Sequence, residues 1–540
     1  MVVSLLLAGL MCSTAFAEGN WVEGFLARYR APQVSTKLRS TISITTQDTI
    51  RLLLENNRDV SVNRLVPVSS LYEAEALTRL FEPVFYANAN MNRANTPSQT
   101  LLAGAPSLLQ LTHNLRFGFD HVLTTGTVYN FNVEFIRGSS NSTFNLFNPF
   151  YNGLITYSLT QHLLRDFGRA VNTAKIRIAR NNEKMSELQF ELQIVDLITD
   201  TLELYWDLKF AEEDVKVKQR SLDLAKRTLR DSQIQVEIGT LAPIDLVQPE
   251  ADVAERNEAL LTAQYNVDLL QDQLKKLISK DIDPGVALAR LNLIESADEP
   301  NGQTLLSLET AIQHALESRR EMKLAGYDLE NREIDVHYTK NQTRPVFSLT
   351  ASYVQAGLGG RQTIRSAFDD PTIIRIIPGG IGDVFNQLFG FDHLGYATGF
   401  NLRIPLKNRA ARAEYERALN ERQISTQRKA ATAQNIVLEV RNAYTQIQKN
   451  EARVTTTRTT RELALRRLEA EQKKFDLGTS TIRFVLEEQR DLAQAETDEI
   501  EALLNYTKAL VNYDRAIGNT LQRNNIEIQK QLPSQVLYQN

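Results

Sequence analysis

Histidines are the side chains that most readily bind metal ions or transfer protons near neutral pH. The chain contains six, and they are His113, His121, His162, His314, His337 and His393. No two of them are three or four residues apart, the spacing that brings two side chains to one face of a helix. The sequence therefore predicts no metal site and assigns the histidines to surface or packing roles.

Other reactive patterns are missing as well. The sequence has no phosphate-binding loop and no Gly-x-Ser-x-Gly motif. The acidic clusters at 212–214 and 487–488 are typical of solvated helix faces. The net charge of -4 gives no basic field for nucleic acid. These features favour a protein that is not an enzyme, needs no cofactor and binds no nucleic acid.

The N-terminus resembles an export signal. An apolar stretch from Val2 to Leu10 precedes Ala15-Phe16-Ala17, the small-x-small pattern of a cleavage site, so we expect a signal peptide at 1–17. No Lys or Arg precedes that stretch, so either the start lies upstream or the signal is atypical; the alternative is a buried strand. The single cysteine, Cys12, lies in this segment. Its removal would exclude disulfides and thiol catalysis.

Two copies of one unit make up most of the chain. Residues 44–92 match 306–354 without a gap, and Gly239-Thr240 falls on Gly478-Thr479. The predicted division therefore has six parts. They are the signal peptide (1–17), an N-terminal extension (18–43), the first repeat (44–280), a linker (281–305), the second repeat (306–520) and a tail (521–540).

Each copy contains one very long predicted helix, at 170–238 and at 409–477, with no Gly or Pro inside. Such a helix of roughly 70 residues would be about 100 Å long. Apolar residues recur at coiled-coil spacing, so these helices need neighbours along their whole length. Gly239 and Gly478 suit the left-handed position after a helix, and we expect Thr240 and Thr479 to cap the returning helix. Pro249 should kink the first returning helix or mark its start.

Alternating polarity predicts strands between the helices. The segments are 84–90, 115–119, 128–135, 154–160, 346–354 and 398–406. Strands of this kind fit an outer-membrane barrel or a soluble sandwich. Aromatic residues near the strand ends favour the membrane, where such residues form belts at the headgroup level. They are Phe144, Phe147, Phe150, Tyr151, Phe385, Phe389, Phe391 and Tyr396. No apolar run outside the N-terminus reaches the ~18 residues of a membrane-spanning helix, so a spanning chain would have to do so with strands.

Several short sequence segments strengthen this interpretation. Two of them, 158–165 and 401–406 with Pro405, lie where a predicted strand leads into a long helix. The third is Phe475-Asp476-Leu477-Gly478-Thr479 at the second tip, followed by Leu486, Gln489 and Ala493. Together with the duplication and the two Gly-Thr tips, these segments resemble the TolC family of outer-membrane efflux proteins. The resemblance covers about residues 44 to 520.

The resemblance implies an α+β membrane protein: a trimeric β-barrel with a long periplasmic α-helical coiled-coil tunnel, built from two internal repeats. Each chain of the homotrimer would give four strands to a shared barrel surrounded by outer-membrane lipid. The implied function is a passive export duct of a tripartite efflux or type I secretion system. Its partners would be a periplasmic adaptor and an inner-membrane pump, which the sequence leaves open as proton-driven or ATP-driven. Strand-like residues at 114–136 depart from the family, either as a hairpin above the barrel or as longer strands.

The resemblance also implies two kinds of site. The hairpin tips would dock the adaptor through Gly239, Thr240, Leu241, Gly478, Thr479 and Ser480. The periplasmic aperture would be lined by Asp245, Arg483 and Glu487. Family members close this aperture with Tyr and Arg where this chain has Phe475 and Ser480, so we expect Asp245 to pair with Arg483 instead. Glu487 from three chains would form an acidic ring that favours cations.

Two other classes of protein compete with a channel. A periplasmic or surface coiled-coil scaffold would explain the helices, but not two strand blocks at equal points of two repeats. A barrel enzyme or adhesin would not need helices of about 100 Å. The channel therefore explains more of the sequence than either alternative.

Overall fold

The computed structural model describes residues 41–99, 103–280, 289–296, 305–366 and 372–527. The predicted signal peptide with Cys12 lies outside the described residues. Nearly all of the predicted N-terminal extension, most of the predicted linker and the end of the predicted tail do so too.

The described chain divides into two compact units. Unit 1 comprises Met1–Arg58, Ile198–Asn301 and Lys449–Ala509, and unit 2 comprises Asp59–Leu197, Gly302–Gln448 and Leu510–Asn540. Both copies of the repeat contribute segments to each unit. The repeats are therefore not the compact units, because each copy runs through both of them.

The predicted order of elements is confirmed in both copies. The first copy runs through α2 (Thr46–Asn56), α3 (Arg58–Ala76), η1 (Leu77–Phe81), four strands, α4 (Arg169–Asn172), α5 (Ala174–Glu237), η3 (Pro243–Leu246) and α6 (Val247–Ile278). The second runs through α8 (Leu308–Ser318), α9 (Arg320–Gln342), strands, α11 (Arg409–Asp476), α12 (Ile482–Ile517) and α13 (Thr520–Arg523). The long helices α5 and α11 have 64 and 68 residues, as their unbroken sequences predict.

Unit 1 has an apolar core around a short parallel sheet that the sequence did not reveal. Strand β1 (Thr41–Ile44) pairs with β6 (Arg290–Leu293). Ile44 packs in one buried cluster with Tyr205 and Trp206 of α5. Burial raises the pKa of Tyr205 to about 12, so its hydroxyl stays protonated and donates to the Ile44 carbonyl at 3.3 Å. The sheet thereby fixes one face of the long helix.

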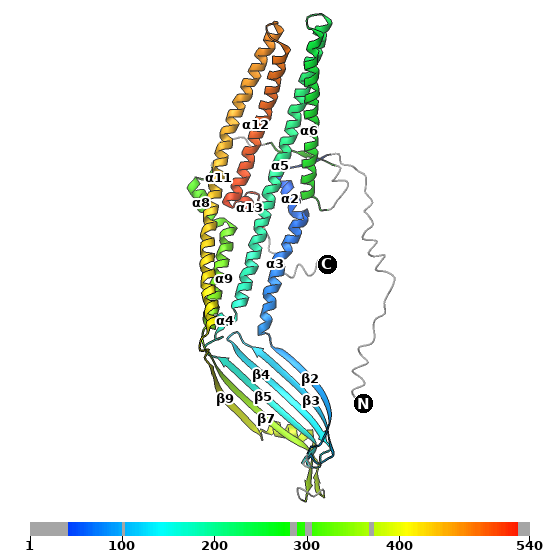
Figure 1. Ribbon diagram of the computed structural model, residues 1–540, viewed down its shortest axis with the longest axis vertical. Coiled ribbons are helices and arrows are strands. Elements are labelled where there is room, and N and C mark those ends of the chain that lie inside the picture. The colour runs from blue at the N-terminus through cyan, green and yellow to red at the C-terminus, as the bar shows by residue number, and fades with distance from the viewer. Residues whose placement is uncertain (1–40, 100–102, 281–288, 297–304, 367–371, 528–540) are drawn as a thin grey trace, which may run out of the picture. The chain divides into compact units, whose positions relative to one another are not determined.

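Unit 2 contains one antiparallel sheet (Figure 1). Its strands are β2 (Val84–Pro97), β3 (Ser107–Val122), β4 (Thr127–Ser140), β5 (Phe147–His162), β7 (Val346–Arg365), β8 (Ile373–Ile377) and β9 (Leu394–Arg403). The order is β2-β3-β4-β5-β7, and both β8 and β9 pair with β7. Each predicted strand is present, and most are longer than predicted because the alternation continues beyond the most apolar residues.

The strand-like residues at 114–136 form neither of the two expected arrangements. They make up β3 and β4, which lie within the sheet between β2 and β5. The sheet thus has six long strands in a continuous antiparallel series, where the family resemblance implies four. Alternating polarity identified these residues as strands but could not say which neighbours they pair with.

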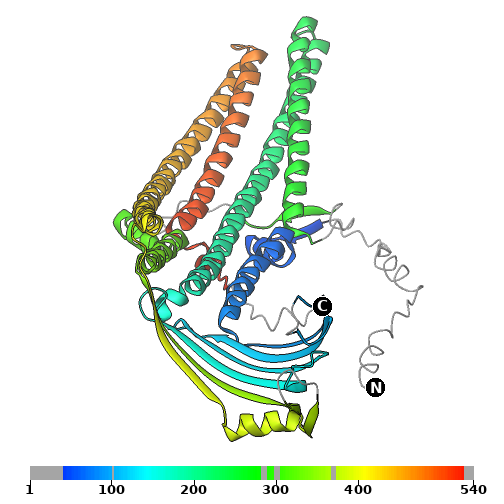
Figure 2. The same ribbon diagram turned by 60° about the horizontal axis from the view of Figure 1, so that its bottom comes forward.

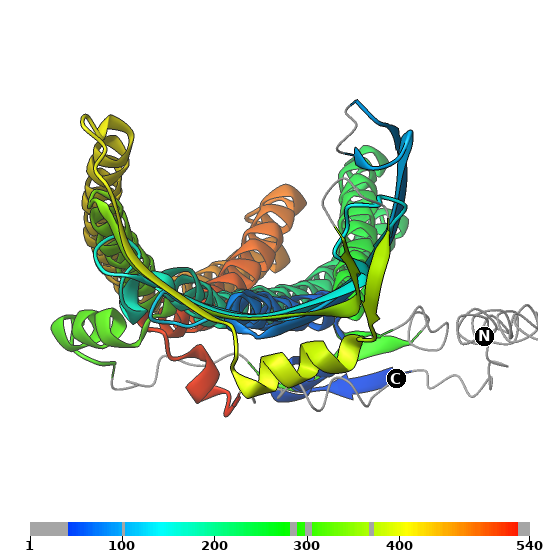
Figure 3. The ribbon, with the colours of Figure 1, turned by 90° about the horizontal axis from the view of Figure 1, so that it is seen from below.

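A short helix, α10 (Ile381–Gly390), covers part of the sheet and lies against its convex side (Figures 2 and 3). Its buried Val384 and Leu388 face Gly153 of β5 and Gly357 of β7. A Cβ at Gly357 would lie 2.7 Å from the Val384 carbonyl oxygen, so only glycine permits this approach. Phe385 and Phe389, two of the aromatic residues expected near the strand ends, therefore belong to a packed helix.

Candidate functional site

The first hairpin tip follows α5 and ends it with a Schellman motif. The Gly239 amide donates to Val236 at 3.0 Å and the Thr240 amide to Gln235 at 2.9 Å. Gly239 has φ +81, so the predicted left-handed position is confirmed. Helix α6 begins at Val247, which puts Pro249 in its first turn, as one of the two expected arrangements required.

The second tip has the same backbone. Gly478 has φ +75, and its amide donates to Phe475 at 2.9 Å, while the Thr479 amide donates to Lys474 at 2.9 Å. The expected role of Thr240 and Thr479 in capping the returning helices is wrong. The Thr479 hydroxyl donates backward to the Lys474 carbonyl at 3.0 Å, and Thr240 makes the equivalent bond to Gln235. The tight turn brings each hydroxyl back over the carbonyls that the preceding helix leaves free.

The predicted aperture residues are all exposed. Asp245 lies in η3, and Arg483 and Glu487 lie in the first turns of α12. Within the described residues of a single chain, no hydrogen bond or ion pair joins Asp245 to Arg483. Ser480 instead donates a hydrogen bond to Glu471, which also pairs with Lys474 at 2.8 Å. The pairing of Asp245 with Arg483 therefore remains a prediction about neighbouring hairpins or chains.

Buried polar contacts hold the helices behind the tips. The Arg256 side chain of α6 pairs with Asp252 at 2.7 Å and donates to the Ser221 hydroxyl of α5 at 2.7 Å and to the Leu486 carbonyl of α12 at 3.4 Å. Gln489 donates to the Thr228 hydroxyl at 3.1 Å, so it links α12 to α5. Arg256 and Gln489 are both almost fully buried. Their contacts hold α6 and α12 at fixed positions along α5.

The contact between α10 and the sheet tells which side chains lie on which face. Gly153 and Gly357 are cross-strand partners, and both meet α10 on the convex face. Because side chains alternate along a strand, the register assigns every other residue of each strand to the same face. The two faces of the sheet can therefore be compared residue by residue.

The convex face is apolar. Its members include Phe85, Met91, Leu115, Phe117, Phe131, Val133, Phe135, Ile155, Tyr157, Tyr353, Phe400 and Leu402. Aromatic pairs cross the strands: Phe131 lies 4.8 Å from Tyr157, and Phe347 lies 5.7 Å from Phe400, between ring centroids. At the two edges of the sheet Phe85 is 69% and Phe400 is 71% exposed. An apolar surface of this extent indicates contact with lipid or protein.

The concave face is polar. Its members include Asn88, Asn90, Asn92, Asn114, Arg116, Asp120, Asn130, Asn132, Glu134, Thr156, Ser158, Ser348, Thr350 and Asn401. Side chains bond across the strands: Asn114 donates to Glu134 at 2.7 Å, and Asn130 donates to Asp120 at 2.8 Å. Such a surface suits contact with water. The alternation is visible in the sequence, but the sequence does not indicate which face of the sheet is concave.

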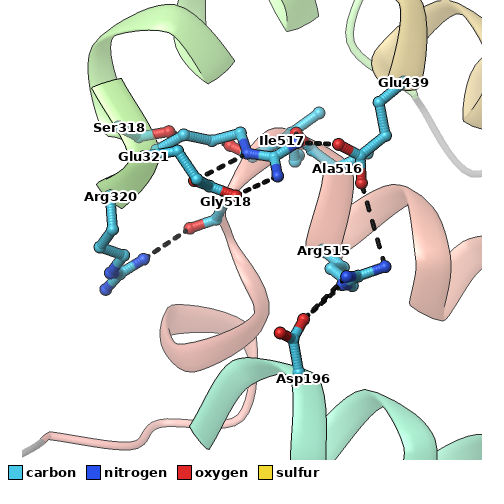
Figure 4. A network of polar contacts seen from close by, with 10 residues as sticks. Asp196, Ser318, Arg320, Glu321, Glu439, Arg515, Ala516, Ile517 and Gly518 are labelled. Atoms are coloured by element: carbon cyan, nitrogen blue, oxygen red, sulfur yellow. Dashed lines mark hydrogen bonds and ion pairs between the residues drawn. The ribbon is translucent and has the colours of Figure 1, made fainter. Parts of the chain in front are cut away.

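A charged cluster in unit 2 was missed by sequence analysis. It lies where α8 gives way to α9 and α12 ends (Figure 4). Arg319 is 7% exposed and pairs with Glu321 and Glu439, while Arg515 pairs with Asp196 at 2.8 Å. Burial alone would lower the pKa of the Arg319 guanidinium, but its hydrogen bonds to Glu321 and Glu439 outweigh burial and raise that pKa. The cluster fixes helices that lead to the sheet.

Neither metal binding nor a helical membrane span emerges from the described chain. Within residues 41–527 and outside the gaps noted above, no group of three or more His, Cys, Asp or Glu side chains is placed to hold a metal ion. The helices of these residues also lack a stretch long and apolar enough to cross a membrane.

Comparison with known proteins gives a family match over most of the chain. The model of the family described as outer membrane efflux protein matches residues 49–280 and 311–519. These two segments correspond to the two predicted repeats. No curated protein matches the sequence.

Solved structures share the fold at low sequence identity. The Campylobacter jejuni CmeC outer membrane channel is 16% identical with a TM-score of 0.60, and the match covers 89% of this chain and 90% of that one. VceC, an outer membrane protein of Vibrio cholerae, is 14% identical with a TM-score of 0.60, covering 88% and 96%. The Neisseria gonorrhoeae MtrE outer membrane channel in its open state is 15% identical with a TM-score of 0.58, covering 88% and 89%.

Proposed function

This chain belongs to the outer membrane efflux protein family, and from that premise we propose that three copies close their sheets into one duct that exports cargo through an adaptor and an inner-membrane pump. The family places the chain in the outer membrane as an efflux channel that extends into the periplasm. The ring of three, the adaptor and the pump are the proposed part.

The two-faced sheet carries the proposal. Its apolar convex face suits lipid, and its polar concave face suits a water-filled lumen, the alternation expected of a membrane barrel. One sheet of six long strands cannot close by itself around a lumen. In the described chain the outer edges of β2 and β9 have no strand partner.

These free edges fit each other. Successive strands from β2 to β9 alternate in direction, and their number is even, so β9 of one chain would run antiparallel to β2 of the next. Apolar Phe85 of β2 and Phe400 of β9 lie on the same convex face, so the joined surface would stay apolar outside. Each copy can therefore bind the next in the same way until the ring closes.

The hairpin tips are the proposed docking surface for a periplasmic adaptor. The two tips share one backbone geometry and expose Gly239, Thr240, Gly478 and Thr479. A Cβ at Gly239 or Gly478 would meet nothing within 4 Å, so none of the described residues of unit 1 shields these positions from a partner. Asp245, Arg483 and Glu487, exposed just beyond the tips, are the proposed aperture residues.

Disulfide cross-linking tests the ring. With Cys12 replaced by Ser, Asn90→Cys on the concave face of β2 is combined with a second cysteine on the concave face of β9. The four positions tried in turn are Gly395, Ala397, Gly399 and Asn401. At least one combination should give covalent trimers on a non-reducing gel. Asn90→Cys with Thr398→Cys, which point to opposite faces, is the control and should not link.

If none of the four combinations links subunits, the edges do not meet and the proposed ring is wrong. Docking is tested separately. Gly239→Val or Gly478→Val should impair export by cells while leaving assembled trimers in the outer membrane. Normal export by both variants would show that the tips do not dock the adaptor.

A further inference from the structure

The sheet of each chain is wider than the resemblance to its family implies. Strands β3 and β4 lie between β2 and β5, and so enlarge the sheet from four to six long strands. Pairing is continuous at each new boundary: β2 pairs with β3 from Val84 to Pro97, and β4 pairs with β5 from Thr127 to Gly138. The added hairpin is therefore part of the sheet and not a loop beside it.

Glycines and aromatic rings fix both boundaries of the hairpin. A Cβ at Gly118 of β3 would lie 2.0 Å from the ring of Tyr86 on β2, so that ring covers the glycine. At the other boundary the ring of Phe150 on β5 covers Gly138 of β4 in the same way, at 2.2 Å. Rings that cover cross-strand glycines pin the register of a sheet. Both boundaries are therefore specific pairings.

The turn between β3 and β4 is also held in place. Gly126 has φ +88, and a Cβ there would lie 2.3 Å from the Asp166 carbonyl oxygen. The Gly168 amide donates to the Thr125 carbonyl at 3.1 Å. Asp166 and Gly168 belong to the connection from β5 to α4. The hairpin thus ends against the start of the helices, as the neighbouring strands do.

Both faces of the hairpin continue the faces of the sheet. Phe117 and Phe131 extend the apolar convex face, while the Asn114–Glu134 and Asn130–Asp120 hydrogen bonds lie on the polar concave face. A hairpin that projected into water above the membrane would not need an apolar face of this kind. The pattern matches a pair of strands that crosses the membrane.

From these observations, and resting on the proposed ring of three chains, we infer that the membrane barrel has eighteen strands. Four strands per chain would give only twelve. At equal strand tilt the diameter of a barrel grows in proportion to the number of strands, so the lumen would be about 1.5 times wider and about twice as large in cross-section. The number of long helical hairpins per chain stays at two. The widening therefore affects the exit through the membrane and not the helical tunnel.

A deletion of residues 103–143 tests this inference. It removes β3 and β4 but leaves β2 and β5 intact, and because two strands are lost, strand directions and faces still alternate. With Cys12 replaced by Ser, a spin label at Thr156→Cys on the concave face of β5 reports distances between chains by pulsed electron paramagnetic resonance. The distance should be about 1.5 times longer in the full-length protein than in the deletion variant at equal tilt.

A label at Lys226→Cys, on the exposed side of α5, is the matched control and should give the same distance in both proteins. Equal distances at Thr156 would show that β3 and β4 do not enlarge the ring. If the deletion variant fails to assemble, electron cryomicroscopy of the full-length protein decides by the strand count: eighteen supports the inference and twelve overturns it. The cross-links between β2 and β9 test the ring itself. A trimer that forms without the expected barrel width is therefore distinguishable from a chain that does not form a trimer.

Discussion

The two copies of the repeat hold the end of the returning helix at the same place but with different side chains. In each, a short helix stops, the chain turns, and side chains at the turn bind the carbonyl end of the returning helix. In unit 1, Asn56 and Asn57 donate to the carbonyls of Ile278 and Leu277 at 3.1 and 3.0 Å. In unit 2, Ser318 donates to Ile517 at 2.8 Å and Arg319 to Ala516 at 3.4 Å. We call these sites the first joint (56–58) and the second joint (318–320).

The backbone at the two joints is nearly the same. Asn57 has φ -65 and ψ 130, and Arg319 has φ -66 and ψ 135. The repeat match also aligns these two positions, since 44–92 falls on 306–354. Shared backbone geometry therefore requires only a donor at this position. Whether the donor is a neutral amide or a buried cation with two carboxylates is decided by the neighbours that each joint has.

The largest effect is expected from Arg319→Met, which breaks the second joint. Removing one partner of a buried ion pair leaves the other charges uncompensated and costs about 3–5 kcal/mol of unfolding free energy. Denaturant unfolding of the purified protein, followed by helical circular dichroism, measures this loss. Adding Glu321→Gln to Arg319→Met should recover part of it. If the double variant is no more stable than Arg319→Met alone, the stability lost at the second joint does not come from uncompensated charge.

Glu321→Gln should have the next largest effect, and that effect should depend on pH. Burial alone would raise the pKa of Glu321, but the hydrogen bond and charge of Arg319 outweigh burial and hold that pKa below its ordinary value. The ionised carboxylate therefore stabilises the fold at neutral pH, and this contribution is lost as the pH falls through the lowered folded-state pKa.

The expected loss for Glu321→Gln at neutral pH is about 2 kcal/mol, the range of a hydrogen bond to a charged group. The difference between parent and variant should shrink below about pH 4. Unfolding midpoints measured from pH 7 downward provide the test. A difference that stays constant over this range would rule out an ionised Glu321 as its source.

Asn57→Ala tests the first joint and should cost less than Arg319→Met. The variant loses the hydrogen bond that the buried Asn57 side chain donates to the Leu277 carbonyl, worth about 1–2 kcal/mol when that carbonyl is left unpaired. Because an amide does not titrate, the loss should be the same at pH 7 and at pH 4. If Asn57→Ala costs as much as Arg319→Met, the two joints do not differ in strength as their charges imply.

The joints and the tips show what the sequence could and could not predict. Gly239 and Gly478 were predicted at positive φ because each follows a long helical run, and this signal is local. The role of Arg319 was missed because two of its partners, Glu439 and Ala516, lie far along the chain.

The sheet shows the same limit of local information. Alternation predicted the six long strands of this sheet, since it depends on adjacent residues only, but it did not predict the short strand β8. It could not place β3 and β4 between β2 and β5, because pairing depends on contacts such as Gly118 with Tyr86, which are distant in sequence. Helix α10 was missed for a similar reason: the flat surface that receives it is formed by Gly153 and Gly357 from different repeats.

The tips should behave alike, in contrast to the joints. Both glycines have φ near +80, and a Cβ at either would meet nothing within 4 Å. Backbone strain is then the only expected cost, so Gly239→Ala and Gly478→Ala should each lower the free energy of unfolding by about 1 kcal/mol. Paired unfolding measurements check this equality. A clear inequality would show that one tip makes contacts that the shared backbone does not reveal.

The smallest effect is expected from Ser480→Ala, at one of the positions where the two tips carry different side chains. Ser480 bonds to Glu471, while the repeat places Leu241 at the corresponding position of the first tip. The hydrogen bond from Lys474, and secondly that from Ser480, lowers the pKa of Glu471. Ser480→Ala should therefore raise that pKa, but less than Lys474→Ala does. Titration of Glu471 by carboxyl NMR in the two variants measures the order. A larger rise with Ser480→Ala would make the hydroxyl, and not the ammonium, the main partner of Glu471, and would make the second tip chemically distinct from the first.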